Sequence, residues 1–242
     1  AQKHLDLTIA DVRNSPMVAY PLTMLDICTM SDGAACCILA SEKVAEKICS
    51  NPVKVTGIGT GTDTMRMADR PHGKVILLKH EDPSWYTNLK YPGVHSFRAG
   101  RSAAKLAYEH AGIENPIEDI DFIELHDAYT SSEIQTYEDL GLCRYGEGGK
   151  FIESGAPALK GKLPVNPSGG LIACGHPVGA TGLMQAVFAF WQLQGTVAKH
   201  NNGDGAIQVK AKKKSRPMRG LIHSHAGTGT YVTVSIMERT NS

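Results

Sequence analysis

The longest apolar stretch of the chain predicts a buried helix. From Leu183 to Leu193, apolar residues occur nearly all round the expected helix rather than along one stripe, which is typical of a helix enclosed on all sides. Gly195 follows, at a position where glycine commonly ends helices. Glycine-rich chain that carries His176 precedes the stretch. We therefore expect the His176 imidazole at the N-terminal mouth of a buried helix, where the helix dipole favours the neutral ring.

Shorter patterns predict elements in the first half of the chain. An apolar run over residues 36–40 fits a buried strand, and Ser41 can cap a helix over residues 42–48. Alternation predicts a strand over residues 53–58. A helical pattern runs from Arg98 to Ala111 and ends at Gly112. Prolines and aromatic residues between 71 and 96 follow no period, so we expect an irregular excursion there.

Two further predicted strands lie next to histidines. Residues 117–125 predict a strand that enters the core, and His126 follows it directly. Thr130 and Glu133 then offer a capping box for a helix that Gly141 can close. Near the C-terminus, residues 231–237 alternate like a half-buried strand after a glycine-rich turn around Gly227. We expect a hairpin there, whose turn presents consecutive backbone N–H groups.

Composition and charge narrow the class of protein. A chain of 242 residues with 42% hydrophobic residues can bury a sizeable core in one or two domains. The 25 basic and 24 acidic residues nearly cancel, which gives no case for nucleic acid. No apolar run reaches the length of a membrane span. The six cysteines form no CxxC pair, and the first residues contain no hydrophobic signal region. We therefore expect a reduced, cytoplasmic protein without membrane segments.

Two local signals allow more than one interpretation. Residues 57–61 contain three alternating glycines, but no helix follows as a dinucleotide loop requires, so we do not expect dinucleotide binding. The run over residues 210–219 is basic. It is interpreted first as a solvated loop and second as a surface that attracts a polyphosphate ligand.

Three blocks, in their order along the chain, resemble the C-terminal half of the thiolase superfamily, in the branch of archaeal and sterol-carrier-protein thiolases. The blocks are His126-Asp-Ala-Tyr129 with the Tyr137–Leu142 segment behind it, Asn166-Pro-Ser-Gly-Gly170 with Gly175-His-Pro-Val-Gly-Ala-Thr-Gly182, and His223-Ser-His-Ala-Gly-Thr-Gly229. In addition, residues 21–40 resemble the final strand of the thiolase N-terminal domain. The resemblance covers essentially the whole chain.

The resemblance implies an α/β, thiolase-like fold: a five-stranded mixed sheet with helices on both faces. Residues 1–50 would be the tail end of the N-terminal domain, and residues 51–242 the C-terminal domain. Family members are usually much longer, and their upstream part carries the nucleophilic cysteine and the loop domain that holds coenzyme A. We expect a fragment, a split subunit or a relative without the nucleophile, and these three stay open.

The resemblance also implies roles for single residues. His126 and His176 would form the oxyanion hole for an enolate, and His176 would help to activate the nucleophilic thiol. The peptide N–H groups near Ala226 and Gly227 would contribute to a second oxyanion hole. The pocket would be lined by Ala128 and Tyr129, and Asp127 would orient its neighbours or act directly.

This sequence departs from the family at the proton-transfer thiol. Ser224 stands where many thiolases place an acid/base cysteine, and Ala128 stands where the other branch places it. Four substitutes stay open. They are Tyr129, His223, His225 and Cys174.

Two rival sites are expected less strongly. His223 and His225 would point to one face of a strand and could bind a metal together with His126, His176 or Asp127; the family uses no metal there. A hydrolase that uses Ser168 is disfavoured, because its surroundings lack the Gly-x-Ser-x-Gly turn.

The expected function is thiolase-type acyl transfer on acyl-CoA thioesters, by Claisen condensation or thiolytic cleavage, with the acyl-CoA as substrate and no bound cofactor. The chain is expected to be inactive without the N-terminal half. The alternatives are retro-aldol cleavage of an acyl-CoA and a non-catalytic acyl-CoA-binding or lipid-binding subunit. The resemblance also implies a homo-oligomer and a small partner protein with a zinc ribbon and an OB-fold.

Overall fold

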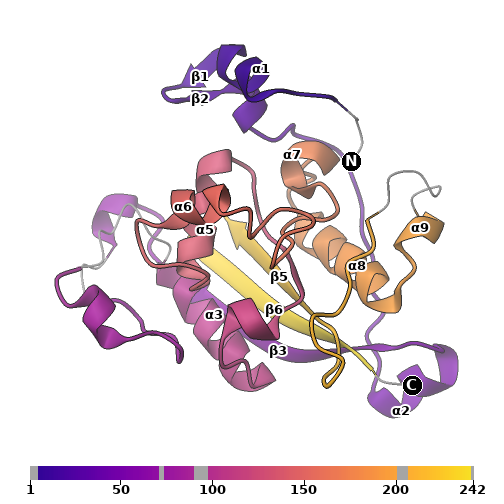
Figure 1. Ribbon diagram of the computed structural model, residues 1–242. Helices are drawn as coiled ribbons and strands as arrows, with labels where there is room; N and C mark the ends of the chain where they lie inside the picture. The colour runs from indigo at the N-terminus through magenta and orange to yellow at the C-terminus, as the bar shows by residue number, and fades with distance from the viewer. Residues whose placement is uncertain (1–4, 71–73, 90–97, 201–206, 241–242) are drawn as a thin grey trace.

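The computed structural model describes residues 5–70, 74–89, 98–200 and 207–240. Its centre is a mixed sheet in the strand order β3-β6-β5-β4, with β3 at Val53–Thr62, β4 at Phe122–Glu124, β5 at Arg219–Ala226 and β6 at Tyr231–Arg239. The pairs β3·β6 and β5·β6 are antiparallel, whereas β4·β5 is parallel. Helices cover both faces of the sheet (Figure 1). The predicted α/β architecture is confirmed.

The predicted strand count of five is not met within the described residues, where the main sheet has four strands. Beyond β4, Val165 forms only an isolated parallel bridge with Ile123. The Ile123 N–H donates to the Pro164 carbonyl at 2.9 Å, and the Asn166 N–H donates to the Ile123 carbonyl at 2.7 Å. A single bridge therefore stands where a fifth strand would pair. A separate two-stranded sheet joins β1 (Met17–Ala19) to β2 (Leu22–Thr23).

The first face of the sheet is covered by α3, whose bounds Arg98–Ala111 are those the sequence predicts. Alternate glycines of β3 lie directly against this helix. A Cβ atom at Gly59 would lie 1.9 Å from the Ala103 carbonyl oxygen, and one at Gly61 would lie 2.0 Å from that of Ala99. The glycine run that superficially resembles a dinucleotide loop is therefore strand, and its glycines allow backbone to contact backbone.

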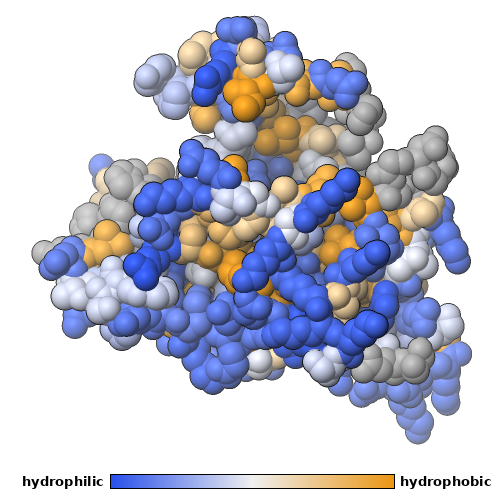
Figure 2. Space-filling model, viewed as in Figure 1, coloured by the Kyte–Doolittle hydropathy of each residue, from blue (hydrophilic) through white to orange (hydrophobic). Residues whose placement is uncertain are grey.

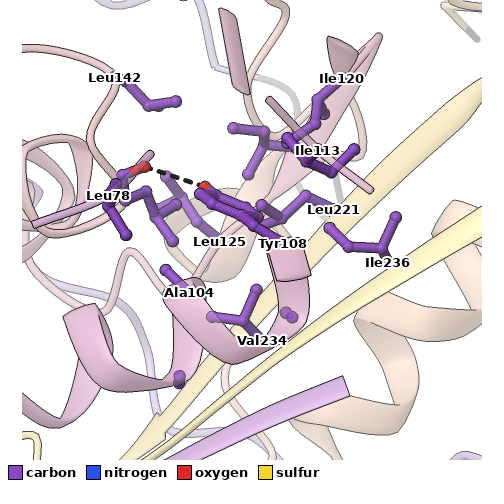
Figure 3. Packing of buried hydrophobic residues seen from close by; sticks show 14 of the residues in the cluster. Leu78, Ala104, Tyr108, Ile113, Ile120, Leu125, Leu142, Leu221, Val234 and Ile236 are labelled. Atoms are coloured by element: carbon purple, nitrogen blue, oxygen red, sulfur yellow. Dashed lines mark hydrogen bonds between the residues drawn. The ribbon is translucent and has the colours of Figure 1, made fainter. Parts of the chain in front are cut away.

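The main hydrophobic core lies between α3, α5 (Thr130–Asp139) and the sheet. Aliphatic side chains of α3, of the sheet and of the adjoining loops lie around the ring of Tyr108, whose hydroxyl donates to the Leu140 carbonyl at 2.9 Å (Figure 3). The Tyr108 side chain is 5% exposed, so this bond satisfies a polar group that water cannot reach. The ring thus ties α3 to the end of α5.

The opposite face is covered by α8 (Thr181–Gln194), which ends at Gly195 in the left-handed conformation as predicted. Its expected enclosure on all sides is wrong. Its buried residues are Thr181, Gln185, Ala189, Gln192 and Leu193, while Leu183 is 47% exposed. The smaller core cluster of this face joins Ala189 and Leu193 to Phe122 and Ile222. In Figure 2 hydrophobic surface shows over the region of α7 (Gly170–Cys174) and α8.

The strand predicted over residues 117–125 is shorter. Residues 116–119 form the short helix α4 (Pro116–Asp119), which Asn115 caps through the Ile117 N–H at 3.1 Å, and strand begins only at Phe122. The capping box predicted before α5 is also different. The Thr130 hydroxyl donates to Asp26 at 3.0 Å, and Ser132 instead bonds the backbone of Tyr129.

The N-terminal part of the chain buries little side-chain area. It contains α1 (Ile9–Asn14), the β1–β2 hairpin and the 3-10 turn η1 (Met24–Asp26), which stand apart from the main body in Figure 1. Residues 36–40 do not form the predicted buried strand; they are extended and exposed, with Ile38 at 87% and Leu39 at 85%. The predicted helix after Ser41 is confirmed as α2 (Glu42–Ile48). The predicted domain boundary near residue 50 stays a prediction.

The described part of the excursion, residues 74–89, is fixed by a buried ion pair; residues 71–73 and 90–96 lie outside the described ranges. Glu81 accepts from the Arg101 guanidinium, which also donates to the Ile76 carbonyl at 2.6 Å and to the Glu138 carbonyl at 2.8 Å. The Arg101 side chain is fully buried. This network joins the excursion to α3 and α5. The remaining short elements are η2 (Met67–Asp69), η3 (Pro83–Tyr86), α6 (Gly148–Glu153) and α9 (Val197–His200).

The basic run over residues 210–219 uses much of its charge inside the fold. Arg216 pairs with Asp121 at 2.7 Å, Arg219 pairs with Glu238 at 2.5 Å, and the Lys212 ammonium donates to the Ile117 carbonyl at 2.7 Å. The polyphosphate interpretation therefore receives no support. In the described ranges, no helix combines the length and the apolar character needed to cross a membrane.

Candidate active site

Two loops and the end of one strand, each with a histidine, meet at the carboxyl ends of β4 and β5. Because β4 and β5 run parallel, their carboxyl ends lie together. His126 lies two residues after the end of β4, and His225 is the penultimate residue of β5. The second loop joins α7 to α8 and carries His176.

The imidazoles are in contact although their positions are far apart in the sequence. The ring centroids of His126 and His176 lie 4.8 Å apart, with the planes at 87°. The ring centroid of His225 lies 4.0 Å from that of His126, and the His223 centroid lies 5.7 Å from that of His225. The predicted meeting of His126 and His176 is confirmed, and two further imidazoles join them.

Backbone and side-chain bonds orient His176. The backbone N–H of His176 donates to the Thr29 carbonyl at 3.0 Å, and the ring Nδ1 lies 2.8 Å from the Thr181 hydroxyl oxygen. A hydroxyl can donate or accept, whereas a carbonyl or a carboxylate can only accept. Thr181 therefore accommodates either neutral tautomer, so Nε2 of His176 can be a proton donor or a proton acceptor.

His126 is held at the end of β4 by its neighbours. The Leu125 N–H donates to the Asn166 side-chain oxygen at 2.8 Å, and the His126 N–H donates to Nδ1 of His223 at 3.5 Å. The second bond requires His223 to keep its proton on Nε2. The Nδ1 atom of His126 is buried and makes no hydrogen bond with the described residues. A buried polar atom without a partner is costly and is a feature that calls for a functional explanation.

Burial keeps these rings neutral. Desolvation, followed by the charges of neighbouring imidazoles, lowers the pKa of His126 to about 2 and that of His225 to about 3. The pKa of His223 is lowered to about 3, mainly by burial. Burial also lowers the pKa of His176, so desolvation is the cause of the expected neutral ring. The cluster can thus donate and accept hydrogen bonds near neutral pH without carrying net charge.

Two buried carboxyls build the loops around the rings. Asp127 is 4% exposed, and its Oδ1 accepts from the Leu171 N–H at 2.6 Å, at the start of α7. A Cβ atom at Gly170 would lie 2.2 Å from its Oδ2, which explains the glycine. Burial raises the pKa of Asp127 to about 7. Burial likewise raises the pKa of Glu124 to about 8, although Glu124 accepts from the Ser168 hydroxyl at 2.6 Å. These contacts fix the Asp127 carboxyl at the start of α7 and hydrogen-bond the Ser168 hydroxyl to the Glu124 carboxyl, while a direct role for Asp127 stays a prediction.

The glycine turn lies directly after the imidazole cluster. Ala226 and Gly227 are exposed and follow His225 in the chain, and Gly227 and Gly229 have φ of +59° and +72°. The Thr230 N–H donates to the Ala226 carbonyl at 3.2 Å and closes the turn. The structure therefore has the predicted hairpin with left-handed glycines in its turn, and the nest of N–H groups stays a prediction.

The other predicted residues are placed less uniformly. Ala128 is 6% exposed, and its carbonyl accepts from the Cys28 N–H at 2.9 Å. Tyr129 is 45% exposed and forms a bridge with Ile27. Ser224 is half-buried and lies on the α8 face of β5, because a Cβ at Gly182 would lie 3.1 Å from its hydroxyl oxygen. Ser224 therefore faces the start of α8.

The open question of the proton-transfer group is narrowed by contacts. The Cys174 thiol donates to the Ser168 carbonyl at 3.0 Å, and burial raises its pKa. His223 is 1% exposed and uses Nδ1 for the His126 backbone. His225 is less enclosed than His223 and has its ring against His126. Among the described residues, no group of three or more histidine, cysteine or acidic side chains is placed to hold a metal ion.

Sequence reasoning missed two supports of the site. Thr181 lies five residues after His176, and its hydroxyl could have been noticed as a partner only once the loop between them was known to fold back. The segment at residues 27–30 crosses both histidine loops, since Met30 also bridges His176. Its contacts are made by backbone atoms, which leave no side-chain signal in the sequence.

Comparisons with known proteins agree on one family. Residues 88–239 match the family profile described as thiolase C-terminal domain-like. An acetyl-CoA acetyltransferase of Methanothermobacter thermautotrophicus is 35% identical over 239 residues, which covers 99% of this chain and 53% of that protein. Sterol carrier protein 2 of Bos taurus is 37% identical over 237 residues, covering 92% of this chain and 40% of that protein. The chain thus spans about half the length, or less, of these relatives.

A solved structure shares the fold. The Ltp2-ChsH2(DUF35) aldolase superposes with a TM-score of 0.69 at 22% sequence identity, covering 98% of this chain and 52% of that chain. At this identity the likeness concerns the fold alone.

Proposed function

This chain belongs to the thiolase family through its C-terminal domain, and we propose that the intact protein transfers acyl groups on coenzyme A thioesters, by Claisen condensation or its thiolytic reverse. The contact of the His126 and His176 rings, 4.8 Å apart beside a glycine turn, carries the proposal. Forming or breaking a carbon–carbon bond next to a thioester carbonyl places negative charge on oxygen, and fixed donors lower that barrier by several kcal/mol.

The proposed roles follow from what each group can donate or accept. Neutral His126 and His176 supply N–H donors to the enolate oxygen, and His176 also exchanges a proton with the nucleophilic thiol, helped by the two-way Thr181 hydroxyl. The N–H groups at Ala226 and Gly227 face the tetrahedral oxyanion. Ala128 and Tyr129 line the pocket.

For the second proton transfer we assign His225. Family members use a thiol there, which this chain lacks at Ala128 and at Ser224. The His225 ring lies 4.0 Å from that of His126, whereas the Cys174 thiol is bonded to a carbonyl. In the condensation direction an imidazole here would take the α-proton from the attacking acyl-CoA, and in the thiolytic direction it would give a proton to the carbanion that cleavage releases.

The nucleophile and the coenzyme A loop domain belong, in this proposal, to a second half of the protein. The chain spans only 53% of its archaeal relative and 40% of its bovine one. The half-exposed apolar face of α8 and the exposed residues Ile38 and Leu39 supply surface for that half to cover.

The test uses the intact protein. We expect acetyl-CoA to form an acyl-enzyme visible as a mass increase of one acetyl group, and acetoacetyl-CoA to be cleaved when coenzyme A is added. His176→Ala should lower turnover by about 10²- to 10⁴-fold, with an unchanged circular dichroism spectrum. His110→Ala is the control for losing an imidazole far from the cluster; His110 is exposed on α3, with its Nδ1 2.8 Å from the Ile58 carbonyl oxygen. An intact protein that forms no acyl-enzyme and cleaves no acetoacetyl-CoA contradicts the proposal.

A second candidate is retro-aldol cleavage of an acyl-CoA. One observation favours it: the thiol expected of a thiolase is replaced at both alternative positions, Ala128 and Ser224. Cys174, the cysteine nearest His176 in sequence, donates its thiol hydrogen to the Ser168 carbonyl. An aldolase also has this fold. An aldolase would release a ketone or aldehyde from a 3-hydroxyacyl-CoA without any acyl-enzyme, so product analysis with that substrate separates the two reactions.

We also propose a partner protein. The aldolase of the same fold is named as an assembly of Ltp2 with a DUF35 protein, and family resemblance implies a small partner with a zinc ribbon and an OB-fold. Co-expression with such a protein, followed by size-exclusion chromatography, tests this part.

A further inference from the structure

A buried arginine far from the imidazoles in sequence contacts the glycine turn. Arg70 is 3% exposed. One terminal nitrogen of its guanidinium donates to the Thr228 carbonyl and, at 3.2 Å, to the Thr228 hydroxyl oxygen, while Nε lies 3.4 Å from the Thr64 carbonyl oxygen. The two ends of this interaction are 158 residues apart. A charged donor gives a stronger hydrogen bond than a neutral one, and the planar fork fixes its direction.

The segment around Arg70 holds the same turn at two more points. The Asp63 N–H donates to the Thr230 carbonyl at 2.8 Å, and the Thr230 hydroxyl lies 3.8 Å from the Met65 sulfur. Residues 63–70 therefore form a supporting segment, defined by these contacts, that lies against the turn at residues 226–230. Arg70 is its only buried charged side chain, since Arg66 is 78% exposed at its side chain.

The turn needs such a support for a physical reason. Gly227 and Gly229 have positive φ, and glycine has more conformations to lose than any other residue. Ala226, Gly227 and Thr228 are also exposed, so their own side chains contribute little packing. A contact from outside the turn must fix its shape, and the Arg70 guanidinium reaches the carbonyl at its tip.

We propose that Arg70 is a positioning residue: it fixes the glycine turn so that the N–H groups at Ala226 and Gly227 point at the developing oxyanion. This inference rests on the proposed function. Arg70 acts through the turn and does not touch the substrate. An oxyanion donor contributes mainly to the chemical step, because it must be in place before the charge develops. Loosening the turn should therefore lower kcat and leave KM nearly unchanged.

The test compares three variants in the intact protein. Arg70→Gln removes the charge and the fork, Arg70→Lys keeps the charge without the fork, and Arg66→Gln makes the first change four residues away at an exposed site. We expect Arg70→Gln to lower kcat about 10- to 100-fold with KM within about twofold. Arg70→Lys should recover only a small part, and Arg66→Gln should match the wild type. Each variant is first checked by thermal unfolding, and rates are taken well below its midpoint.

A second measurement does not depend on activity. Hydrogen exchange followed by mass spectrometry should show faster exchange in the peptide covering residues 226–231 for Arg70→Gln, with the α3 peptide unchanged. Unchanged exchange together with unchanged kcat overturns the Arg70 inference while His176→Ala still tests the proposed function. If the wild type itself has no acyl-transfer activity, the catalytic role fails with the proposed function, and the exchange result still decides whether Arg70 holds the turn. If kcat falls while exchange becomes faster in the α3 peptide as well as in the turn peptide, a general loss of folding explains the variant and the positioning role is overturned.

Discussion

The two long helices on opposite faces of the sheet have equal length and opposite character. Both α3 and α8 have 14 residues. Eight residues of α3 are buried, and the face that meets β3 consists largely of alanines against glycines. α8 is far more apolar in composition, yet it buries five residues, and two of these are the glutamines Gln185 and Gln192. Composition alone would rank their burial the wrong way round.

The two helices close their faces of the sheet to different degrees. α3 completes a core within this chain, and its small residues let backbones approach closely. α8 keeps large apolar residues such as Leu183 at the surface, while the polar Gln192 is used internally: its side-chain oxygen accepts from the Val209 N–H at 2.9 Å. The imidazole cluster lies at the carboxyl ends of β4 and β5, and one of its rings, His176, comes from the loop before α8. The face covered by α3, here called the finished face, is thus closed within this chain, whereas the face covered by α8, the unfinished face, leaves apolar side chains exposed.

The largest effect on stability is expected from the finished face, at the buried ion pair of Arg101 and Glu81. Arg101→Met leaves a carboxylate buried without its charge partner, which typically costs about 3–5 kcal/mol of unfolding free energy. Urea denaturation measures the loss. The double variant with Glu81→Leu should recover a large part of it. A loss below about 1 kcal/mol for Arg101→Met would show that the excursion at residues 74–89 does not depend on this pair.

Glycine-to-alanine changes on the two faces should differ in their cost to stability. Gly59→Ala places a Cβ 1.9 Å from the Ala103 carbonyl oxygen, so α3 must move away from β3, at a cost of about 1–3 kcal/mol. Gly182→Ala on α8 meets only the Ser224 hydroxyl at 3.1 Å, which is a flexible side-chain end. It should cost less than about 1 kcal/mol. Equal losses for the two variants in thermal unfolding would contradict the comparison.

The pH dependence of stability tests the imidazole cluster at the carboxyl ends of β4 and β5, which the two faces share. In the unfolded chain each imidazole has a pKa near 6.5, whereas burial holds the pKa of His126 at about 2 and those of His223 and His225 at about 3. The unfolded state therefore binds more protons below pH 6.5, and each imidazole lowers the unfolding free energy by about 1.4 kcal/mol per pH unit as pH falls.

Two carboxyls act in the opposite sense. Glu124 and Asp127 have pKa values raised to about 8 and about 7, so the folded state holds their protons and their contribution is lost as pH rises through these values. Three imidazoles outweigh two carboxyls on the acid side, and stability should be highest near pH 6.5. Urea denaturation between pH 4.5 and 8.5 measures this, and Glu124→Gln should make the alkaline loss shallower. A steady rise of stability up to pH 8.5 would rule it out.

The smallest effect is expected at the surface of α8. Leu183→Gln changes a side chain that is 47% exposed, so it should alter the stability of this chain by less than about 0.5 kcal/mol. Leu193→Ala, on the same helix at 0% exposure, is the contrasting change and should cost about 2–5 kcal/mol. In the intact protein Leu183→Gln should become costly, because the proposed second half covers it. The same small effect in both contexts would show that α8 stays uncovered.

Local signals predicted well wherever the contacts that decide an element lie within it. The span of α3, the closing glycine of α8 and the β5–β6 hairpin all follow from periodicity and glycine placement. The meeting of His126 and His176 came instead from resemblance, since no periodic pattern relates two loops 50 residues apart. The wrong predictions share a cause. Residues 36–40 and the outer face of α8 are apolar, but none of the residues that the structure describes packs over them.

Other misses come from competition between side chains. Thr130 was expected to cap α5, yet its hydroxyl donates to Asp26, a partner that only the folded chain brings close. Asn115 and Pro116 start α4 where a continuous strand was expected. Arg70 gave no signal at all, because a single arginine among polar residues has no period and its acceptor lies 158 positions away.

The seam between β3 and α3 has a mechanical consequence. Alanine and glycine have no side-chain rotamers to exchange, so this contact cannot relax by local rearrangement and can move only if strand and helix shift as whole bodies. β3 pairs with β6 as far as Thr62 and Tyr231, at the root of the glycine turn. The glycine turn therefore extends from a rigid strand pair that is held against α3 along its glycines. We expect only small displacements of the turn relative to α3.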